Sequence, residues 1–438
     1  MFNKVEKYLF GSLLFAIPFQ IRKIVFYEGW RFNEWLSFSI YLTDVIFFCL
    51  FLMWIYSLAQ KRAVLVIDNY LLIASSLMAI TAFSLFFARD VKVAAFSLLR
   101  LIEFLVFFIY IKEYAIKRFN FHTGLIVLIS SAVLQSIIAI GQYVKQADLG
   151  LRYLGEGMLG LHINGVAVFI NENGERVMRA YGTTPHPNVL AGFLFLSIFA
   201  LYFIWFYRKG FSHNINFLYS VAYAVMLVGL LLTFSRTIIF FWALGFIIRG
   251  LLIGFLPKYR NKFWLNSEMR RKIISILLVT AIVLASFIIM AWPEVLSRIK
   301  ISPDDEAVKL RVYYASETID QRLNWFGSGA GNFVVWLKSK QPNLPEYLYQ
   351  PVHNIYLLLY SELGILGLIT FLSLIGYTFY DFYHSYKFQK LFHYSFILVL
   401  ASILLMGMFD HFLWTLQQGR FILWLSIALI AAKDIKFE

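Results

Sequence analysis

Apolar residues along this chain gather in long runs that are separated by short polar connections. None of the runs alternates apolar and polar residues with a period of two, which disfavours the strands of a membrane barrel. A helix that crosses a bilayer needs about 20 mostly apolar residues, so the pattern predicts about twelve spans, or about ten or eleven because the first and last runs are short. The candidate spans are residues 7–21, 36–58, 64–87, 91–112, 120–143, 187–206, 215–233, 237–255, 272–291, 354–382, 393–413 and 419–433.

The positions of Lys and Arg predict how these helices are oriented. With the N-terminus inside, every inner connection carries Lys or Arg and the short outer connections carry far fewer, as the positive-inside rule requires. Two long loops, 144–186 and 292–353, then face outward, and loops of this length are usually functional or disordered. Because both carry aromatic and apolar residues among the polar ones, we expect them to fold as caps on the bundle. We therefore predict an all-α polytopic membrane protein with about twelve transmembrane helices, forming a single integral domain over residues 1–438.

The composition supports a membrane protein and disfavours several other classes. Hydrophobic residues make up 60% of the 438 residues and charged residues 15%, whereas about a quarter of the residues of a soluble domain are charged. The single cysteine, Cys49, permits neither a disulfide framework nor a cysteine metal site. The net charge of +14 fits positive inner loops and anionic lipid, and we expect no nucleic-acid partner. The apolar run after Lys7 ends without the small residues of a signal-peptide cleavage site.

Polar clusters interrupt the apolar pattern at three places, and the predicted topology puts all three on the outer side. The first cluster runs from Arg179 through His186 into a span that begins with Pro187 and Asn188. Proline is tolerated in the first turn of a helix, and free N–H groups at a helix start beside cationic side chains form a ready anion site. An ordinary helix start with an Arg that reaches the interface is the alternative.

The second and third clusters also lie where a span begins. Ser235 and Arg236 stand in a tight turn between two apolar runs. The guanidinium there could bind two oxygens of one phosphate in bidentate fashion, or it could simply reach the membrane interface. His353 and Asn354 open a later span, and Asn is a good helix cap. A histidine of near-neutral pKa suits general-base chemistry, although a structural role is the alternative. Glu362 follows inside the span, buried beside glycines that permit close helix packing.

Other polar residues give weaker signals. The Gly-rich segment 326–333 lacks the Lys-Ser/Thr of a nucleotide loop, so we interpret it as a tight turn or a contact with a substrate backbone. Arg311 in the same loop is a candidate for substrate contact, although a solvated position is the simpler interpretation. Asp410 and His411 are interpreted as a polar interface turn. Arg100, three residues before Glu103, predicts a structural ion pair, and the spacing of acidic residues predicts no metal site.

These clusters, in this order, resemble the O-antigen ligase and O-antigen polymerase family of bacterial inner-membrane glycosyltransferases. The resemblance covers about residues 90–425 and is strongest over the core region 175–370, in which the His-Asn…Glu-x-Gly run is the most specific piece. The matching residues are Arg179…Gly182…His186-Pro187-Asn188, Phe234-Ser235-Arg236, Gly327-x-Gly329 and His353-Asn354…Glu362-x-Gly364-x-x-Gly367.

The resemblance implies a donor glycan on undecaprenyl pyrophosphate, a lipid, glycan or protein hydroxyl as acceptor, and no cofactor, metal or nucleotide sugar. It places the reaction on the extracytoplasmic face of the bacterial inner membrane, in contact with membrane lipids. His353 would be the general base, and Arg179 and Arg236 would hold the pyrophosphate. The candidates for supporting roles are His186, Asn188, Ser235, Arg311, Asn354 and Glu362.

Several functions remain open at this point. A ligase, a polymerase and a protein O-oligosaccharyltransferase would share these motifs and differ only in the acceptor. A polysaccharide or lipid transporter is the alternative of another class. It should show an internal repeat, broken helices and ionisable residues near the bilayer midplane. No repeat is evident, and the polar clusters lie at one face.

Overall fold

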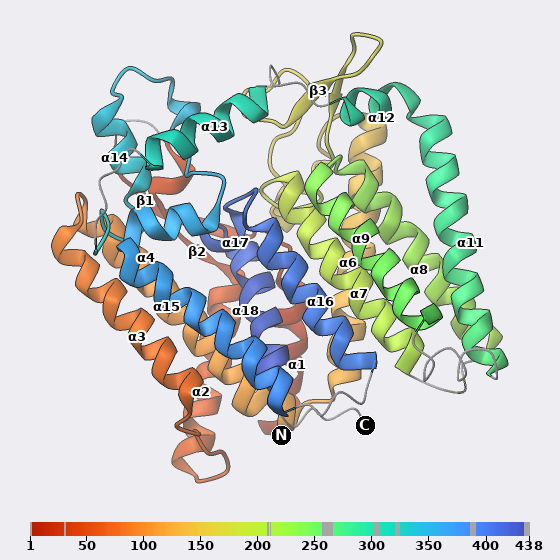
Figure 1. Ribbon diagram of the computed structural model, residues 1–438, viewed down its shortest axis with the longest axis horizontal. Coiled ribbons are helices and arrows are strands. Elements are labelled where there is room, and N and C mark those ends of the chain that lie inside the picture. The colour runs from red at the N-terminus through yellow and green to blue at the C-terminus, as the bar shows by residue number, and fades with distance from the viewer. Residues whose placement is uncertain are drawn as a thin grey trace.

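The computed structural model describes residues 2–29, 32–207, 210, 212–255, 266–300, 306–319, 325–385 and 391–432. Most of them lie in helices, as the apolar pattern predicted, and two short hairpins contain the described strands (Figure 1). The helices are α1 (Phe2–Ala16), α2 (Leu42–Ala59), α3 (Asn69–Ser84), α4 (Val91–Tyr110), α5 (Ile116–Arg118), α6 (Phe121–Lys145), α7 (Pro187–Tyr207), α8 (His213–Leu232), α9 (Arg236–Phe255), α11 (Ser267–Met290), α12 (Trp292–Ile299), α13 (Glu306–Ile319), α14 (Phe333–Lys340), α15 (Ile355–Ser385), α16 (Leu391–Met406), α17 (Phe412–Thr415) and α18 (Gln417–Ala431). The strands are β1 (Arg22–Tyr27), β2 (Ser37–Tyr41), β3 (Val168–Ile170) and β4 (Arg176–Met178).

Eight helical segments in the described part of the chain are long and apolar enough to cross a membrane. They contain α2, α3, α4, α6, α7, α8, α11 and α15. The four other predicted spans coincide with α1, α9, α16 and α18, which are not among the eight. The predicted helical membrane-type fold is therefore confirmed, while the count of about twelve spans remains a prediction.

Two helices form the centre of the bundle. In α7, 94% of the most apolar window is buried, and α18 buries every residue except Arg420. α7 packs against α6 and α8, and α18 packs against α4 and α16. By contrast, α11 buries only 11% of its window, so its apolar side chains face outward, as expected of a surface that contacts lipid.

Capping residues move two predicted helix starts. The span expected from residue 36 begins as strand β2, and α2 starts only at Leu42, because the backbone N–H of Tyr41 donates to Asp44 (2.8 Å). Similarly, α3 starts at Asn69 rather than at residue 64, because the Asp68 carboxylate accepts the N–H of Leu71 (3.1 Å). The pattern of apolar residues alone missed both starts, because apolar residues before a helix can also lie in a strand or in a connection.

The first hairpin was also not predicted. β1 and β2 pair antiparallel, with Arg22 opposite Tyr41. The connection between them is held by Arg22, which donates to both carboxylate oxygens of Glu34 at 2.5 and 2.7 Å. Two short strands without a third are marginal alone, so this hairpin depends on such contacts and on its packing against the bundle.

Elements of both long loops lie at one end of the bundle in Figure 1, where β3, α12, α13 and α14 are found, while the two chain ends are marked at the other end. Residues 301–305 and 320–324 of the second loop lie outside the described residues. The loops contact each other: the N–H of Glu172 donates to Pro293 (3.3 Å), and the Glu172 carboxylate pairs with Lys300 (2.7 Å).

Helix α15 is broken at Gly364, whose φ of 69° and ψ of −168° are not helical. The Gly-rich segment lies against this break: the N–H groups of Ser328 and Gly329 donate to the carbonyls of Ser361 (2.9 Å) and Glu362 (3.0 Å). Backbone groups that are freed within a membrane protein need such partners. The glycines therefore allow the two backbones to approach closely at the break. This agrees with our interpretation of 326–333 as a tight turn.

We predict that Gly364→Ala destabilises the protein by about 1–3 kcal/mol, because only glycine adopts this backbone conformation readily. A Cβ at this position would also clash with the carbonyl group of Trp325. The measurement is the melting temperature in detergent. Gly376→Ala in the same helix is the control, since no atom lies within 4 Å of its added Cβ. Equal melting temperatures for the two variants would contradict the prediction.

Candidate active site

Arg179 joins the first polar cluster to the second. It follows β4, and its N–H donates to Ala167 (3.1 Å). Its guanidinium donates from Nε to the carbonyl of Thr233 (2.7 Å) and from Nη2 to Oδ1 of Asn188 (2.6 Å). Because Thr233 lies in the turn that leads to Arg236 at the start of α9, the two arginines that the sequence analysis singled out are brought to the same place.

Asn188 continues this network to a segment more than two hundred residues away. Its Nδ2 donates to Oδ2 of Asp410 (2.5 Å), while Oδ1 of Asp410 accepts the N–H of Phe412 (3.2 Å). The backbone N–H of Asn188 donates to Nδ1 of His186 (3.1 Å), which leaves Nε2 of that ring as the nitrogen that carries the hydrogen. The start of α7 is thereby fixed to the loop before α17.

His353 contacts two aromatic rings. It stacks on Tyr314 with a centroid distance of 5.8 Å and an interplanar angle of 18°. It also meets the ring of His411 at 4.9 Å and 68°. Asn354 caps α15 by accepting the N–H groups of Tyr356 (2.9 Å) and Leu357 (3.1 Å). Among the described residues, neither ring nitrogen of His353 has a hydrogen-bond partner, and Nδ1 is buried.

The guanidinium groups lie close enough to influence one another. Burial lowers the pKa of Arg179 to about 10, and the neighbouring Arg311 and Arg236 act in the same direction, while Tyr181 and Asp410 oppose them. Within the described part of the chain, Arg311 makes no hydrogen bond or ion pair, and its Nε is buried. Arg311 is half-buried, and a buried guanidinium nitrogen without a partner is costly, which indicates a site for an anion.

The imidazoles at this site are neutral at pH 7. Burial lowers the pKa of His186 and of His411 to about 3. Burial also lowers the pKa of His353, with Asp410 acting to raise it and Arg311 to lower it further. Burial acts to raise the pKa of Asp410, but the imidazoles and the hydrogen bond from Asn188 outweigh it, so this carboxyl has a pKa below its usual range. A neutral imidazole beside fixed cations can accept a proton.

Two predicted supporting residues lie apart from the histidines. Glu362 is buried, and its carboxylate faces the backbone N–H groups of Gly331 and Phe333, so it supports the Gly-rich segment. Ser235 is also buried, and its N–H donates to the Thr233 hydroxyl (3.3 Å). Ser235 therefore shapes the turn before Arg236.

One interpretation from the sequence was wrong. Asp410 and His411 do not form an interface turn: they are 9% and 4% exposed and lie within the site. Arg311 is half-buried, with its Nε buried and its charge acting to lower the pKa of His353, so its contact with substrate stays a prediction. The signal for Asp410 and His411 was present in the sequence, since they precede an apolar span just as the three polar clusters do.

The sequence analysis also expected an ion pair within α4. Arg100 does pair with Glu103 (2.7 Å), and it pairs with Asp44 of α2 as well (2.8 Å). Gln417 at the start of α18 donates to the same Asp44 (2.5 Å). The pair is thus part of a larger buried network beside the histidines.

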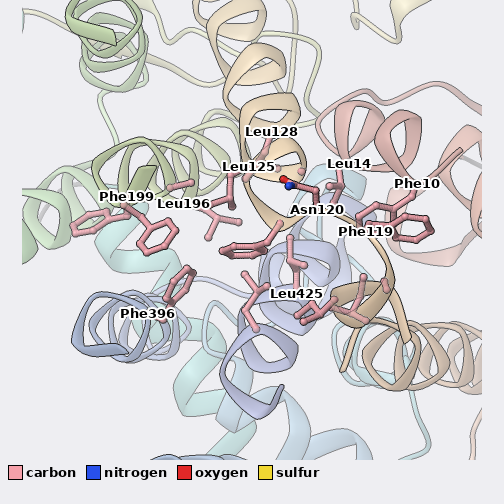
Figure 2. A pocket seen from close by; sticks show the side chains of 18 of the residues that line it. Phe10, Leu14, Phe119, Asn120, Leu125, Leu128, Leu196, Phe199, Phe396 and Leu425 are labelled. Atoms are coloured by element: carbon pink, nitrogen blue, oxygen red, sulfur yellow. The ribbon is translucent and has the colours of Figure 1, made fainter. Parts of the chain in front are cut away.

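Two cavities in the described part of the molecule differ in chemistry. One, of about 50 Å³, is lined by side chains such as Phe10, Leu125 and Phe199, with Asn120 as its polar member (Figure 2). Since no titratable side chain lines it, it offers no acid or base. The other, of about 110 Å³, is lined by polar and aromatic residues including Trp35 and Thr415, and both of these contact His411.

Comparison with known proteins gives one family match. Residues 221–372 match the family model described as O-antigen ligase. The matched region contains Arg236, Arg311 and His353, while Arg179 and Asp410 lie outside it. No curated protein matches the chain.

We predict that inorganic pyrophosphate raises the melting temperature of the detergent-solubilised protein by several degrees, because a ligand that binds only the folded state stabilises it. Arg311→Ala should reduce this shift to less than half. Arg89→Ala is the matched control, since Arg89 is exposed and donates to Ser339 (2.5 Å) away from the cluster. Equal shifts in the two variants would show that pyrophosphate does not bind near Arg311.

Proposed function

We propose, on the premise that residues 221–372 match the O-antigen ligase family, that this chain transfers a glycan from undecaprenyl pyrophosphate to a hydroxyl acceptor. The observation that carries the proposal is the convergence of Arg179, Arg236 and Arg311 with the neutral base His353 around Asp410. The reaction takes place on the extracytoplasmic side of the bacterial inner membrane, and requires no metal.

The arginines account for departure of the leaving group. Diphosphate carries about two negative charges and departs as an anion, and fixed cations at the position where charge develops usually contribute most to such catalysis. A guanidinium group can donate two parallel hydrogen bonds to two oxygens of one phosphate. Arg179 is held by Thr233 and Asn188, so it needs no reorganisation when the anion forms, and Arg311 is left with its donors available.

His353 accounts for activation of the acceptor. Its imidazole takes the proton of the acceptor hydroxyl as that oxygen forms a bond to the anomeric carbon of the donor sugar. The bond from this carbon to the phosphate oxygen breaks, and its electron pair leaves with the diphosphate. Attack from the side opposite the leaving group inverts the anomeric centre.

The acceptor separates the members of this reaction class. A lipid acceptor would make the protein a ligase, a second lipid-linked glycan a polymerase, and a protein side chain an O-oligosaccharyltransferase. Incubation of the purified protein with a lipid-linked glycan and each acceptor in turn distinguishes them. The break in α15 is a feature that a transporter would share, but the Gly-rich segment that fills it accounts for it without a moving substrate.

We predict that His353→Ala lowers the rate of glycan transfer by about 10²–10⁴-fold, the usual contribution of a general base. Expression and the elution volume in detergent should stay unchanged. His384→Ala is the control, because His384 is an exposed histidine at the far end of α15, the helix that follows His353. Full activity of His353→Ala would exclude the general-base role.

We further predict that the transfer rate falls only below about pH 6.5, because His353 must be neutral to act and its pKa lies below the ordinary value of a histidine. Arg311→Gln removes a charge that lowers this pKa, so the acidic limb of the rate profile should move to higher pH. The measurement is transfer rate against pH at saturating donor. A limb that stays in place would indicate that another group titrates.

A further inference from the structure

The polar cavity of about 110 Å³ lies beside the histidines and is not used by the steps above. Strand β2, α4, the Gly-rich segment with the start of α14, α15 at Glu362, the end of α17 and the start of α18 enclose it. Trp35 meets the ring of His411 edge-on at 4.8 Å, and the Thr415 hydroxyl lies 2.8 Å from Nδ1 of His411. Since both residues line the cavity, it shares a wall with the site.

Arg420 presents unused hydrogen-bond donors at this cavity. Its Nε donates to the carbonyl of Trp414 (2.6 Å), and neither Nη atom is hydrogen-bonded to a described residue. Arg100 also lines the cavity, but its guanidinium is occupied by Asp44 and Glu103. Gln417 is 3% exposed, and its Oε1 has no partner in the described part of the chain. Buried polar groups are normally satisfied, so these two side chains indicate a polar ligand.

The rest of the lining fits a sugar ring. Trp35, Phe38, Phe96 and Trp414 provide aromatic surface, which matches the apolar C–H faces of a pyranose, while Arg420 can reach its hydroxyl groups. A water needs roughly 10–15 Å³ of such volume, so the cavity has room for about one sugar ring rather than an oligosaccharide. The charged side chains of the lining are two arginines, Arg100 and Arg420, and two glutamates, Glu34 and Glu362, a balance that favours a neutral ligand over an anionic headgroup.

We propose that this cavity binds the acceptor sugar whose hydroxyl receives the glycan, an inference that rests on the proposed transferase function. The cavity lining includes none of Arg179, Arg236 and Arg311, which would hold the leaving group. The cavity reaches the base through His411, whose ring meets Trp35 and Thr415 of the lining and also the ring of His353. An acceptor held in the cavity would therefore lie near the proposed base and on residues other than those that would hold the leaving group.

The first test measures acceptor and donor KM for Arg420→Lys, with an acceptor that supports transfer by the wild type. Lysine keeps the charge but loses the planar set of donors, so we expect acceptor KM to rise about tenfold, with donor KM unchanged. Arg89→Lys, an exposed arginine outside the cavity, should change neither value. A rise in donor KM alone, or no change, would overturn the acceptor site.

The second test measures binding without catalysis. The probe is the oligosaccharide mixture released by mild acid from the host's surface glycan, labelled and dialysed against full-length His353→Ala protein. Ser97→Leu, which introduces a larger side chain into the cavity lining, should abolish binding in this background. Ser76→Leu, on the exposed surface of α3, should not.

The outcomes separate the two proposals. Probe binding that is lost in Ser97→Leu supports the acceptor cavity even if no acceptor supports transfer, and in that case the transferase function is what fails. Transfer by the wild type with probe binding that is unchanged in Ser97→Leu retains the function and overturns the cavity. No binding of the probe, as with a protein acceptor, or its displacement by anionic phospholipid, also overturns the cavity.

Discussion

The hydrogen bonds from Arg179 to Asn188 and from Asn188 to Asp410 are the contacts on which the site depends. They connect a loop, the start of α7 and the segment before α17, which lie far apart in the sequence. Asp410 is buried, and Arg179 and Asn188 are half-buried, so removal of either hydrogen-bond donor leaves the buried carboxylate with less compensation. Because α7 is the buried centre of the bundle, this network fixes the cationic side chains to the most rigid part of the molecule.

Burial sets the charges within that frame. Low dielectric lowers the pKa of an imidazole and of a guanidinium alike. The guanidinium still stays charged at pH 7, because its pKa begins far higher. The same environment therefore leaves Arg179 cationic, with its pKa near 10, and His353 neutral. A proton acceptor and an anion site can then coexist within one cluster at pH 7. Asp410 supports this separation, since its negative charge offsets the mutual repulsion of the arginines.

The sequence indicated helices and polar clusters correctly but could not indicate their partners. Runs of apolar residues predicted the helices, and Pro187 and Asn354 marked two helix starts where the structure has them. Arg22 and Glu34, which hold the first hairpin, gave no local signal, since a bidentate pair depends on the turn between them. The partial burial of Arg311 gave no local signal either, because it comes from neighbours that are remote in sequence.

Chemistry of the proposed kind also requires the acceptor and the leaving group on opposite sides of the anomeric carbon, and the fold provides two unlike surfaces near the base. The arginines come from a loop, a tight turn and α13, whereas the polar cavity is built by β2, α4 and α18. Tyr314 contacts His353, His353 contacts His411, and His411 contacts Trp35 of the cavity lining. His353 has no hydrogen bond to orient it among the described residues, so its orientation depends on these ring contacts. Packing, rather than a carboxylate partner, therefore holds the base.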